Sequence, residues 1–131
     1  MAITEEIRPG IRLLVCGGRD YEEKVNAREM VKKTIAAIRP GLIIEGGAEG
    51  ADRLAGYAAV ELEIPYHTYH ADWEQYGRKA GFIRNSQMLK EGKPDLVLAF
   101  PGGKGTAMMV SIALKAGVPV IMGDFMDWQT P

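Results

Sequence analysis

The sequence lacks the features of a secreted or membrane-spanning protein. It has one cysteine among 131 residues, so no intramolecular disulfide can form. No apolar stretch approaches the roughly 20 residues that cross a bilayer, and the first eight residues contain no apolar signal core. We therefore expect a cytoplasmic protein with no membrane partner.

An excess of charge of one sign is also lacking. The 16 Lys and Arg residues are balanced by 17 Asp and Glu residues, which gives a formal net charge of -1. Nonspecific DNA binding depends on a large positive field. Nucleic acid is therefore not the expected partner, and binding of single-stranded DNA in a basic groove with stacking aromatics is kept only as an alternative.

Paired metal-ligand spacing is missing as well. The two histidines, His67 and His70, stand in no metal-binding pattern with cysteine or carboxylates. We expect no metal and no cofactor.

What the sequence does contain is a regular alternation of short apolar runs with helical periodicity. The apolar runs predict strands at residues 11–16, 42–45, 64–69, 95–100 and 118–122. The three-then-four spacing predicts helices at about 23–38, 51–62, 76–90 and 106–116, with a polar loop over 70–74 and a C-cap at Gly117. At the first helix, either Asp20 with Glu23 or Asn26 with Glu29 is expected to form a capping box.

This alternation predicts an α/β fold, because parallel neighbours need right-handed crossovers. We expect a single Rossmann-like, three-layer domain over residues 1–131, with short terminal extensions at 1–10 and 124–131. Its parallel sheet of about five strands, in the order 3-2-1-4-5, would carry helices on both faces. Ligands bind outside the carboxyl ends of such strands, where the strand order reverses, and three glycine-rich turns fall there.

The turn over residues 101–106 (PGGKGT) follows a buried strand and opens a helix, so its backbone N–H groups and the helix dipole favour an anion. A tight turn capped by threonine is the alternative. The predicted phosphate-binding residues here are Pro101, Gly102, Gly103, Lys104, Gly105 and Thr106, although Lys104 also fits a solvated loop lysine.

The turn over residues 46–52 (GGAEGAD) occupies the equivalent place after the second strand and brings carboxylates with it. Glu45 or Asp52 would accept hydrogen bonds from a ribose or assist catalysis at its anomeric carbon. A helix-dipole role for Asp52 and an arginine pair for Glu45 are the alternatives. Gly46 and Gly47 are predicted to contact the ligand.

The first turn, residues 16–20 (CGGRD), places Gly17, Gly18 and Arg19 at the predicted reversal point. The Arg19 guanidinium would bind a phosphate or carboxylate with two parallel hydrogen bonds, or else pair with Asp20 or Glu45. Cys16 is interpreted as a small buried apolar residue rather than a nucleophile.

Residues 72–85 concentrate aromatic, basic and amide groups. Trp73 or Tyr76 would stack a base, unless Trp73 is purely structural. Polar side chains that would reach a phosphate or a base edge are Arg78, Arg84 and Asn85. Asp72 is also predicted to contact the ligand. Arg84 and Met88 share one helical stripe, so one end of it is expected in the site and the other in the core.

Together these motifs resemble the YspA-like branch of the SLOG superfamily, the Rossmann-like group that includes the LOG phosphoribohydrolases and the DprA/Smf proteins. The resemblance covers nearly the whole chain and rests on residues 16–20, 46–52, 71–73, 81–85 and 100–106. It implies a nucleotide-derived ligand, such as a nucleoside phosphate, ADP-ribose or a nucleotide-sugar, held over the PGGKGT turn. It also implies a homo-oligomer paired through helices, and Phe125, Met126 and Trp128 offer apolar surface for pairing.

The LOG enzymes extend that turn to a glutamate and use it with an arginine of the preceding helix to cleave the base from a nucleoside monophosphate. Here Met109 stands at the glutamate position, and Arg84 matches the arginine. Without the carboxylate, the oxocarbenium-like transition state lacks its charge partner unless Glu45 or Asp52 supplies it. The sequence therefore favours a sensor or binding protein, with an N-glycoside hydrolase using Glu45, Asp52 and Arg84 as the alternative.

Overall fold

A computed structural model describes residues 10–125 of the chain. Five parallel strands form one sheet in the order β3-β2-β1-β4-β5, which confirms the predicted order. The strands are β1 (Arg12–Cys16), β2 (Leu42–Glu45), β3 (Tyr66–Thr68), β4 (Leu96–Ala99) and β5 (Val120–Met122). The order reverses between β1 and β4, so the crevice between their carboxyl ends is the expected ligand position.

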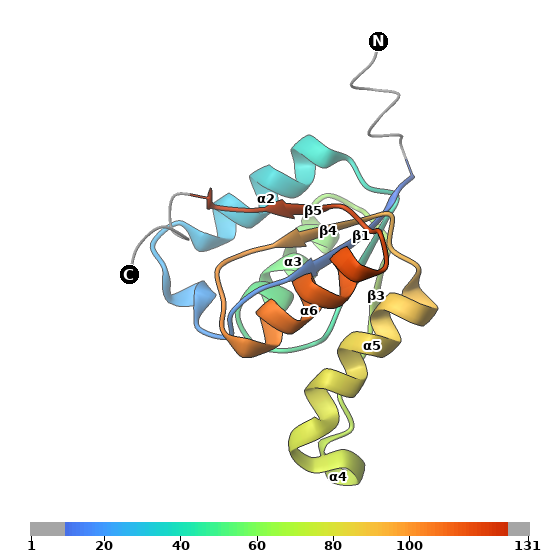
Figure 1. Ribbon diagram of the computed structural model, residues 1–131. Helices are drawn as coiled ribbons and strands as arrows, with labels where there is room; N and C mark the ends of the chain where they lie inside the picture. The colour runs from blue at the N-terminus through green and yellow to red at the C-terminus, as the bar shows by residue number, and fades with distance from the viewer. Residues whose placement is uncertain (1–9, 126–131) are drawn as a thin grey trace.

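Helices cover both faces of the sheet, and the fold is the predicted Rossmann-like α/β domain (Figure 1). One face carries α2 (Ala27–Ile38) and α3 (Ala51–Glu61), and the other carries α5 (Ala80–Gly92) and α6 (Lys104–Lys115). Short helical turns complete the chain: η1 (Tyr21–Glu23), α4 (Trp73–Tyr76) and η2 (Gly77–Lys79).

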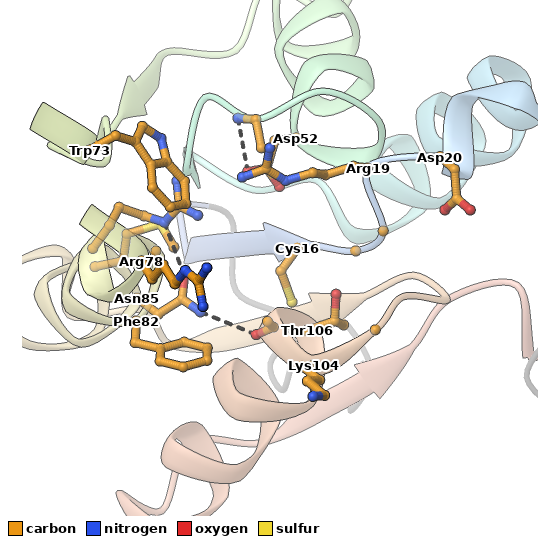
Figure 2. A pocket seen from close by; sticks show the side chains of 18 residues that line it. Cys16, Arg19, Asp20, Asp52, Trp73, Arg78, Phe82, Asn85, Lys104 and Thr106 are labelled. Atoms are coloured by element: carbon orange, nitrogen blue, oxygen red, sulfur yellow. Dashed lines mark hydrogen bonds between the residues drawn. The ribbon is translucent and has the colours of Figure 1, made fainter. Parts of the chain in front are cut away.

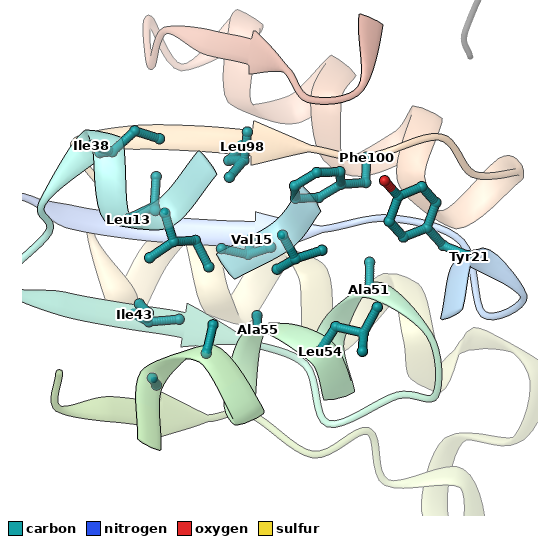
Figure 3. Close-up of a cluster of buried hydrophobic side chains, with 14 of the residues drawn as sticks. Leu13, Val15, Tyr21, Ile38, Ile43, Ala51, Leu54, Ala55, Leu98 and Phe100 are labelled. Carbon is teal, nitrogen blue, oxygen red and sulfur yellow. The ribbon is translucent and has the colours of Figure 1, made fainter. Parts of the chain in front are cut away.

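The core is divided between the two faces by the alternation of side chains along β1. Leu13 and Val15 lie in the cluster formed with α2 and α3, drawn in Figure 3, whereas Leu14 and Cys16 lie in the cluster formed with α5 and α6. All four side chains are buried. A central strand that is buried on both faces reads as a continuous apolar run, which is why its sequence predicted a strand so clearly.

The start of α2 differs from the prediction. The chain forms η1 and then begins α2 at Ala27, and neither Asp20 nor Asn26 caps a helix with its side chain. Both proposed capping boxes are therefore wrong. Asn26 has a left-handed φ of 67°, so its backbone does not take the extended conformation that an N-cap side chain needs.

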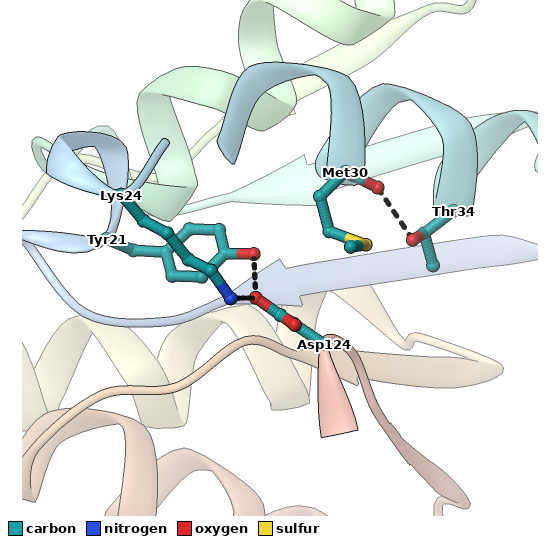
Figure 4. A network of polar contacts seen from close by, with 5 residues as sticks. All are labelled: Tyr21, Lys24, Met30, Thr34 and Asp124. Carbon is teal, nitrogen blue, oxygen red and sulfur yellow. Dashed lines mark hydrogen bonds and ion pairs between the residues drawn. The ribbon is translucent and has the colours of Figure 1, made fainter. Parts of the chain in front are cut away.

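Tertiary contacts fix this segment instead (Figure 4). The buried Tyr21 ring packs against Phe100 with centroids 5.1 Å apart. Its hydroxyl donates a hydrogen bond of 2.8 Å to Asp124, which also pairs with Lys24. Contacts with the segments that follow β4 and β5 thus position the chain after β1.

The region before α5 also differs from the prediction. Part of the predicted loop forms α4, because the Asp72 carboxylate caps its first turn by accepting from the Gln75 N–H at 3.0 Å. The predicted helix from residue 76 is interrupted at Gly77, whose φ of 58° is left-handed, and the longer helix begins at Ala80. Figure 1 shows α4 extending beyond the sheet layers.

The edge strands are shorter than predicted for a shared reason. The Ile64 N–H donates to Ala59 of α3 and the Val118 N–H donates to Ala113 of α6, so both residues still belong to helix ends. The other strands differ by at most one residue at either end. Phe125 is exposed, whereas Met126 and Trp128 lie outside the described residues.

The glycine turns meet because the chain after β1 is bonded on both sides. The Gly18 N–H donates to the Pro101 carbonyl at 2.9 Å, and the Gly18 carbonyl accepts from the Ala51 N–H at 3.2 Å. A Cβ on Gly17 would lie 2.6 Å from Ala51 Cβ and 2.9 Å from Phe100 Cβ. This close approach brings the amino ends of α3 and α6 to one edge of the sheet.

We predict that Gly17→Ala destabilises the protein by about 1–3 kcal/mol, because the added methyl group overpacks this junction. The free energy of unfolding in urea measures the effect. Gly56→Ala is the matched control, since a Cβ there meets nothing within 4 Å. Its removal of a mid-helix glycine should stabilise the protein by up to ~1 kcal/mol. Equal effects of the two variants would contradict the close approach at Gly17.

Candidate functional site

A cavity of about 490 Å³ opens at the carboxyl ends of β1 and β4, where the strand order reverses. This volume lies within the range of ~300–1,000 Å³ usual for small-molecule sites. Its walls come from the turn after β1, the start of α3, the α4–α5 region and the first turn of α6, as Figure 2 shows. The cavity occupies the crevice that the strand order predicts.

The amino end of α6 forms one wall. The N–H groups of a first helical turn have no acceptor within the helix, and the N-cap residue here, Gly103, offers no side-chain cap. A Cβ on Gly103 or Gly105 would meet nothing within 4 Å, although both residues line the cavity. Packing therefore does not require glycine at either position, and their bare backbone leaves room for a ligand.

Gly102 is different, because its backbone is crowded. A Cβ there would lie 2.2 Å from Thr106 Oγ1 and 2.6 Å from the Gly18 nitrogen. Its neighbour Pro101 supplies the carbonyl that holds Gly18. Neither residue lines the cavity, and both hold the α6 turn in place.

Asn85 connects α5 to the α6 turn. This buried amide donates from Nδ2 to the Gly105 carbonyl at 3.1 Å. Its Oδ1 accepts from Arg84 Nε at 3.0 Å. One side chain thus fixes both the backbone at the start of α6 and the direction of a neighbouring guanidinium.

Arg84 is half-buried at the cavity wall and also donates from Nη1 to the Gly46 carbonyl. Burial lowers its pKa, Arg19 lowers it further, and Asp52 and Glu45 partly offset this. Met88, one turn further along α5, is buried in the core and also lines the cavity. The helical stripe therefore runs from the site into the core, with Met88 at the boundary.

Asp52 lies in the cavity wall at the start of α3. It is 6% exposed and accepts hydrogen bonds from the Gly46 and Ala48 N–H groups at 3.2 and 3.3 Å. Burial raises its pKa from 3.8 to about 6, against the hydrogen bond from Ala48 and the charge of Arg84. Its carboxyl group therefore titrates near neutral pH.

Glu45 lies outside the cavity wall. It is 4% exposed, accepts from the Gly47 N–H at 2.5 Å, and accepts a second hydrogen bond from the Thr68 hydroxyl. The Gly50 N–H in turn donates to the Glu22 carboxylate at 2.8 Å. Carboxylates of the protein thus occupy the backbone donors of the second glycine turn.

Basic residues predominate in the cavity. Arg19, Arg78, Arg84 and Lys104 line it, against two carboxylates, Asp20 and Asp52. Within residues 10–125 none of these four cations forms a direct ion pair. A positive cavity in a chain whose net charge is -1 is suited to an anionic ligand.

Aromatic side chains complete the opening. Trp73 and Phe82 line the cavity and are each about half exposed. The Arg19 guanidinium lies over the Trp73 ring, 5.4 Å from its centroid, rather than pairing with Asp20 or Glu45. These rings provide flat apolar surfaces beside the charged wall.

Cys16 also lines the cavity, but its thiol is held in the protonated form. The thiol is buried, and burial with the nearby Asp52 charge raises its pKa far above the usual range. A thiol without an accessible thiolate is a poor nucleophile, in agreement with its interpretation as an apolar residue.

Most of the predicted site residues come together in this cavity. Those in the wall are Gly17, Gly18, Arg19, Asp52, Trp73, Arg84, Asn85, Gly103, Lys104, Gly105 and Thr106. Those outside it are Glu45, Gly46, Gly47, Asp72, Pro101 and Gly102. The outside group supports the wall by hydrogen bonds, capping or close packing.

The wall also contains Arg78, which was predicted to reach a phosphate or a base edge. Wall residues that were not among the predicted site residues are Cys16, Asp20, Ala48, Gly81, Phe82 and Met88. Arg78 and Phe82 belong to the basic and aromatic segment that the sequence singled out. Ala48 and Met88 carry no polar group, so the sequence offered no chemical signal for them.

Two comparisons with known proteins agree with this architecture. Residues 11–76 match the YAcAr family, described as the YspA, cpYpsA-related SLOG family. The chain is similar to the Gene 61 protein of Mycobacterium phage D29, with 35% identity over 118 residues, which cover 84% of this chain and 94% of the relative.

The chain belongs to the YspA, cpYpsA-related SLOG family. Membership in this SLOG family suggests a nucleotide-related role, either ligand binding or a glycosidase-like activity. Met109, at the position of the LOG glutamate, is fully buried in the core beside Cys16 and Met88 and does not line the cavity. In this SLOG protein, Asp20 and Asp52 are the carboxylates in the wall.

Among the helices of the described segment, none has the length and apolar content needed to cross a membrane. Within residues 10–125, His, Cys, Asp and Glu side chains do not gather in groups of three or more that could hold a metal ion.

We predict that Asp52→Asn changes how stability depends on pH. Because the folded-state pKa is about 6, above the ordinary 3.8, the folded protein keeps a proton that the unfolded chain releases between about pH 4 and 6. Asp52 therefore lowers the free energy of unfolding as pH rises through this window, by up to ~3 kcal/mol. Urea titrations from pH 3 to 8 should show that the variant lacks this decline.

Asp124→Asn is the control with the opposite sign. Burial raises the pKa of Asp124, but hydrogen bonds from Lys24 and Tyr21 lower it more, so that its pKa lies below the ordinary value. Its stabilisation is present above about pH 4 and is lost as pH falls further. Parallel stability curves for wild type and Asp52→Asn between pH 4 and 6 would contradict the shift at Asp52.

Proposed function

We propose that this protein binds a nucleotide-derived ligand in the β1–β4 cavity, as a sensor or ligand-binding protein. The observation that carries the proposal is the α6 turn. Its first-turn N–H groups border a positive cavity, and bare glycine backbone leaves space beside them. A phosphate group is the ligand chemistry that matches a helix N-terminus with adjacent cations.

The other walls fit the remaining parts of a nucleotide. Trp73 and Phe82 offer ring faces on which a base would stack. Asp52 lies where its carboxyl group would accept hydrogen bonds from ribose hydroxyls. We assign Glu45 a supporting role, because its oxygens already accept from Gly47 and Thr68.

A second candidate function is hydrolysis of the N-glycosidic bond of the same ligand class. It is favoured by Asp52, a buried carboxyl group with a pKa of about 6 that lies in the wall near Arg84. Such a group would protonate the departing base or stabilise an oxocarbenium-like sugar while water attacks its anomeric carbon. The buried Met109 gives this reaction no further carboxylate.

We predict that Gly105→Ala weakens nucleotide binding without unfolding the protein. The added methyl group meets no protein atom within 4 Å, so it would occupy ligand space beside the α6 turn. Calorimetric titration with AMP should show at least a roughly tenfold rise in Kd, which corresponds to about 1.4 kcal/mol. Gly56→Ala, an equally uncrowded helix position outside the cavity, should bind as wild type does.

The same preparations distinguish the two functions. AMP and other nucleoside monophosphates are incubated with the protein, and free base is measured by chromatography. Binding without released base supports the function of a sensor or ligand-binding protein. Base release that disappears in Asp52→Asn supports the hydrolase. Wild-type affinity in Gly105→Ala would overturn the assignment of the α6 turn.

The cytoplasmic location and the self-association expected from the sequence stay predictions.

A further inference from the structure

Three of the four cations of the cavity fall into two groups on different walls. Lys104 lies at the amino end of α6, where the free N–H groups of the first turn also point. Arg19 and Arg84 belong instead to the side formed by the β1 turn and α5. A single phosphate at the α6 turn leaves the second group to be explained.

The second group surrounds one corner of the cavity. The Arg19 guanidinium covers the Trp73 ring. An added Cβ on Gly81 would lie 3.4 Å from Trp73 Cη2 and 3.9 Å from Arg84 Nη2, so the indole edge and the Arg84 head border the same space. Figure 2 shows Arg19 and Trp73 on this side of the cavity, with Thr106 and Lys104 across from them.

Both guanidinium groups retain unused donors. Arg84 donates from Nε to Asn85 and from Nη1 to Gly46, and its Nη2 has no acceptor among the described residues. Arg19 stacks on the indole, and within residues 10–125 its N–H groups donate to no protein oxygen. A guanidinium held by its face or its inner nitrogens presents its remaining N–H groups to an oxyanion.

The electrostatics of this corner favour a second negative charge. Arg19 and Arg84 are close enough that, in addition to burial, the charge of Arg19 lowers the pKa of Arg84. The buried carboxyl group nearby is Asp52, whose own ionisation burial opposes. Across the whole wall, four basic side chains face two carboxylates.

We propose that the ligand carries two linked phosphate groups, one at the α6 turn and one between Arg19 and Arg84. This inference rests on the proposed function and narrows its ligand to a nucleotide that contains a diphosphate group. Asn85 fits this arrangement, because it joins the Gly105 carbonyl to Arg84 Nε and so holds the two anion positions one side chain apart. The shared chemistry is that of a nucleoside diphosphate or of a diester such as ADP-ribose.

The test compares AMP, ADP and ADP-ribose by calorimetric titration at fixed salt. Wild type should bind at least one of the two diphosphates about tenfold or more tightly than AMP, as expected for an added charge-assisted contact. ADP and ADP-ribose then distinguish the two sources, since a free terminal phosphate favours ADP and a bound second sugar favours ADP-ribose.

Two exposed residues provide matched variants. Arg19→Met keeps an apolar side chain over Trp73 but removes the charge, and it should weaken diphosphate binding about tenfold while AMP binding changes less than about twofold. Lys104→Met removes a charge at the α6 turn and should weaken AMP and diphosphate binding by the same factor.

The outcomes separate this inference from the proposed function. Equal affinity of AMP and the diphosphates, or equal losses for all three ligands in Arg19→Met, overturns the two-phosphate ligand and leaves nucleotide binding intact. If none of the three nucleotides binds to the wild-type protein, both this inference and nucleotide binding are overturned.

Discussion

The structure depends on the backbone hydrogen bonds that hold the chain after β1 between two other turns. The Gly18 N–H donates to Pro101 and the Gly18 carbonyl accepts from Ala51, so the amino ends of α3 and α6 converge. The contact requires Gly17 and Gly102, where any Cβ would collide with a neighbour. The cavity exists because three parallel strands end together and their turns share these bonds.

The glycine-rich turns look alike in sequence but differ in electrostatics. Around residues 46–50 the backbone donors bind Asp52, Glu45 and Glu22, so the protein supplies its own anions there. At the amino end of α6 no side chain caps the first turn, and basic residues line the space in front of it. Of the glycine-rich turns, only the α6 turn combines open donors with a positive surrounding, which is why we propose it, rather than the turn after β2, as the position for a phosphate.

Strand order and the position of the crevice could be predicted from the sequence, because alternating strands and helices allow few topologies. The direction in which individual side chains point could not be predicted from the sequence. Glu45 ends an apolar strand and seemed suited to catalysis, yet the hydroxyl of Thr68, 23 residues away, donates a hydrogen bond to one of its carboxylate oxygens. The capping boxes failed because Tyr21 and Lys24 contact Asp124, which is about 100 residues distant. Such contacts leave no local pattern.

The two walls of the cavity differ in how much their residues contribute to the packing of the protein. On the α6 side, Thr106 and Asn85 are buried, and Asn85 donates a hydrogen bond to the Gly105 carbonyl, so changes there disturb packing. On the opposite side, α4 and η2 contain no buried residue, although Trp73 and Arg78 from these turns line the cavity. Evolution can therefore alter the second wall with little loss of core stability. The scaffold can therefore keep the backbone at the start of α6 unchanged while the opposite wall of the cavity varies.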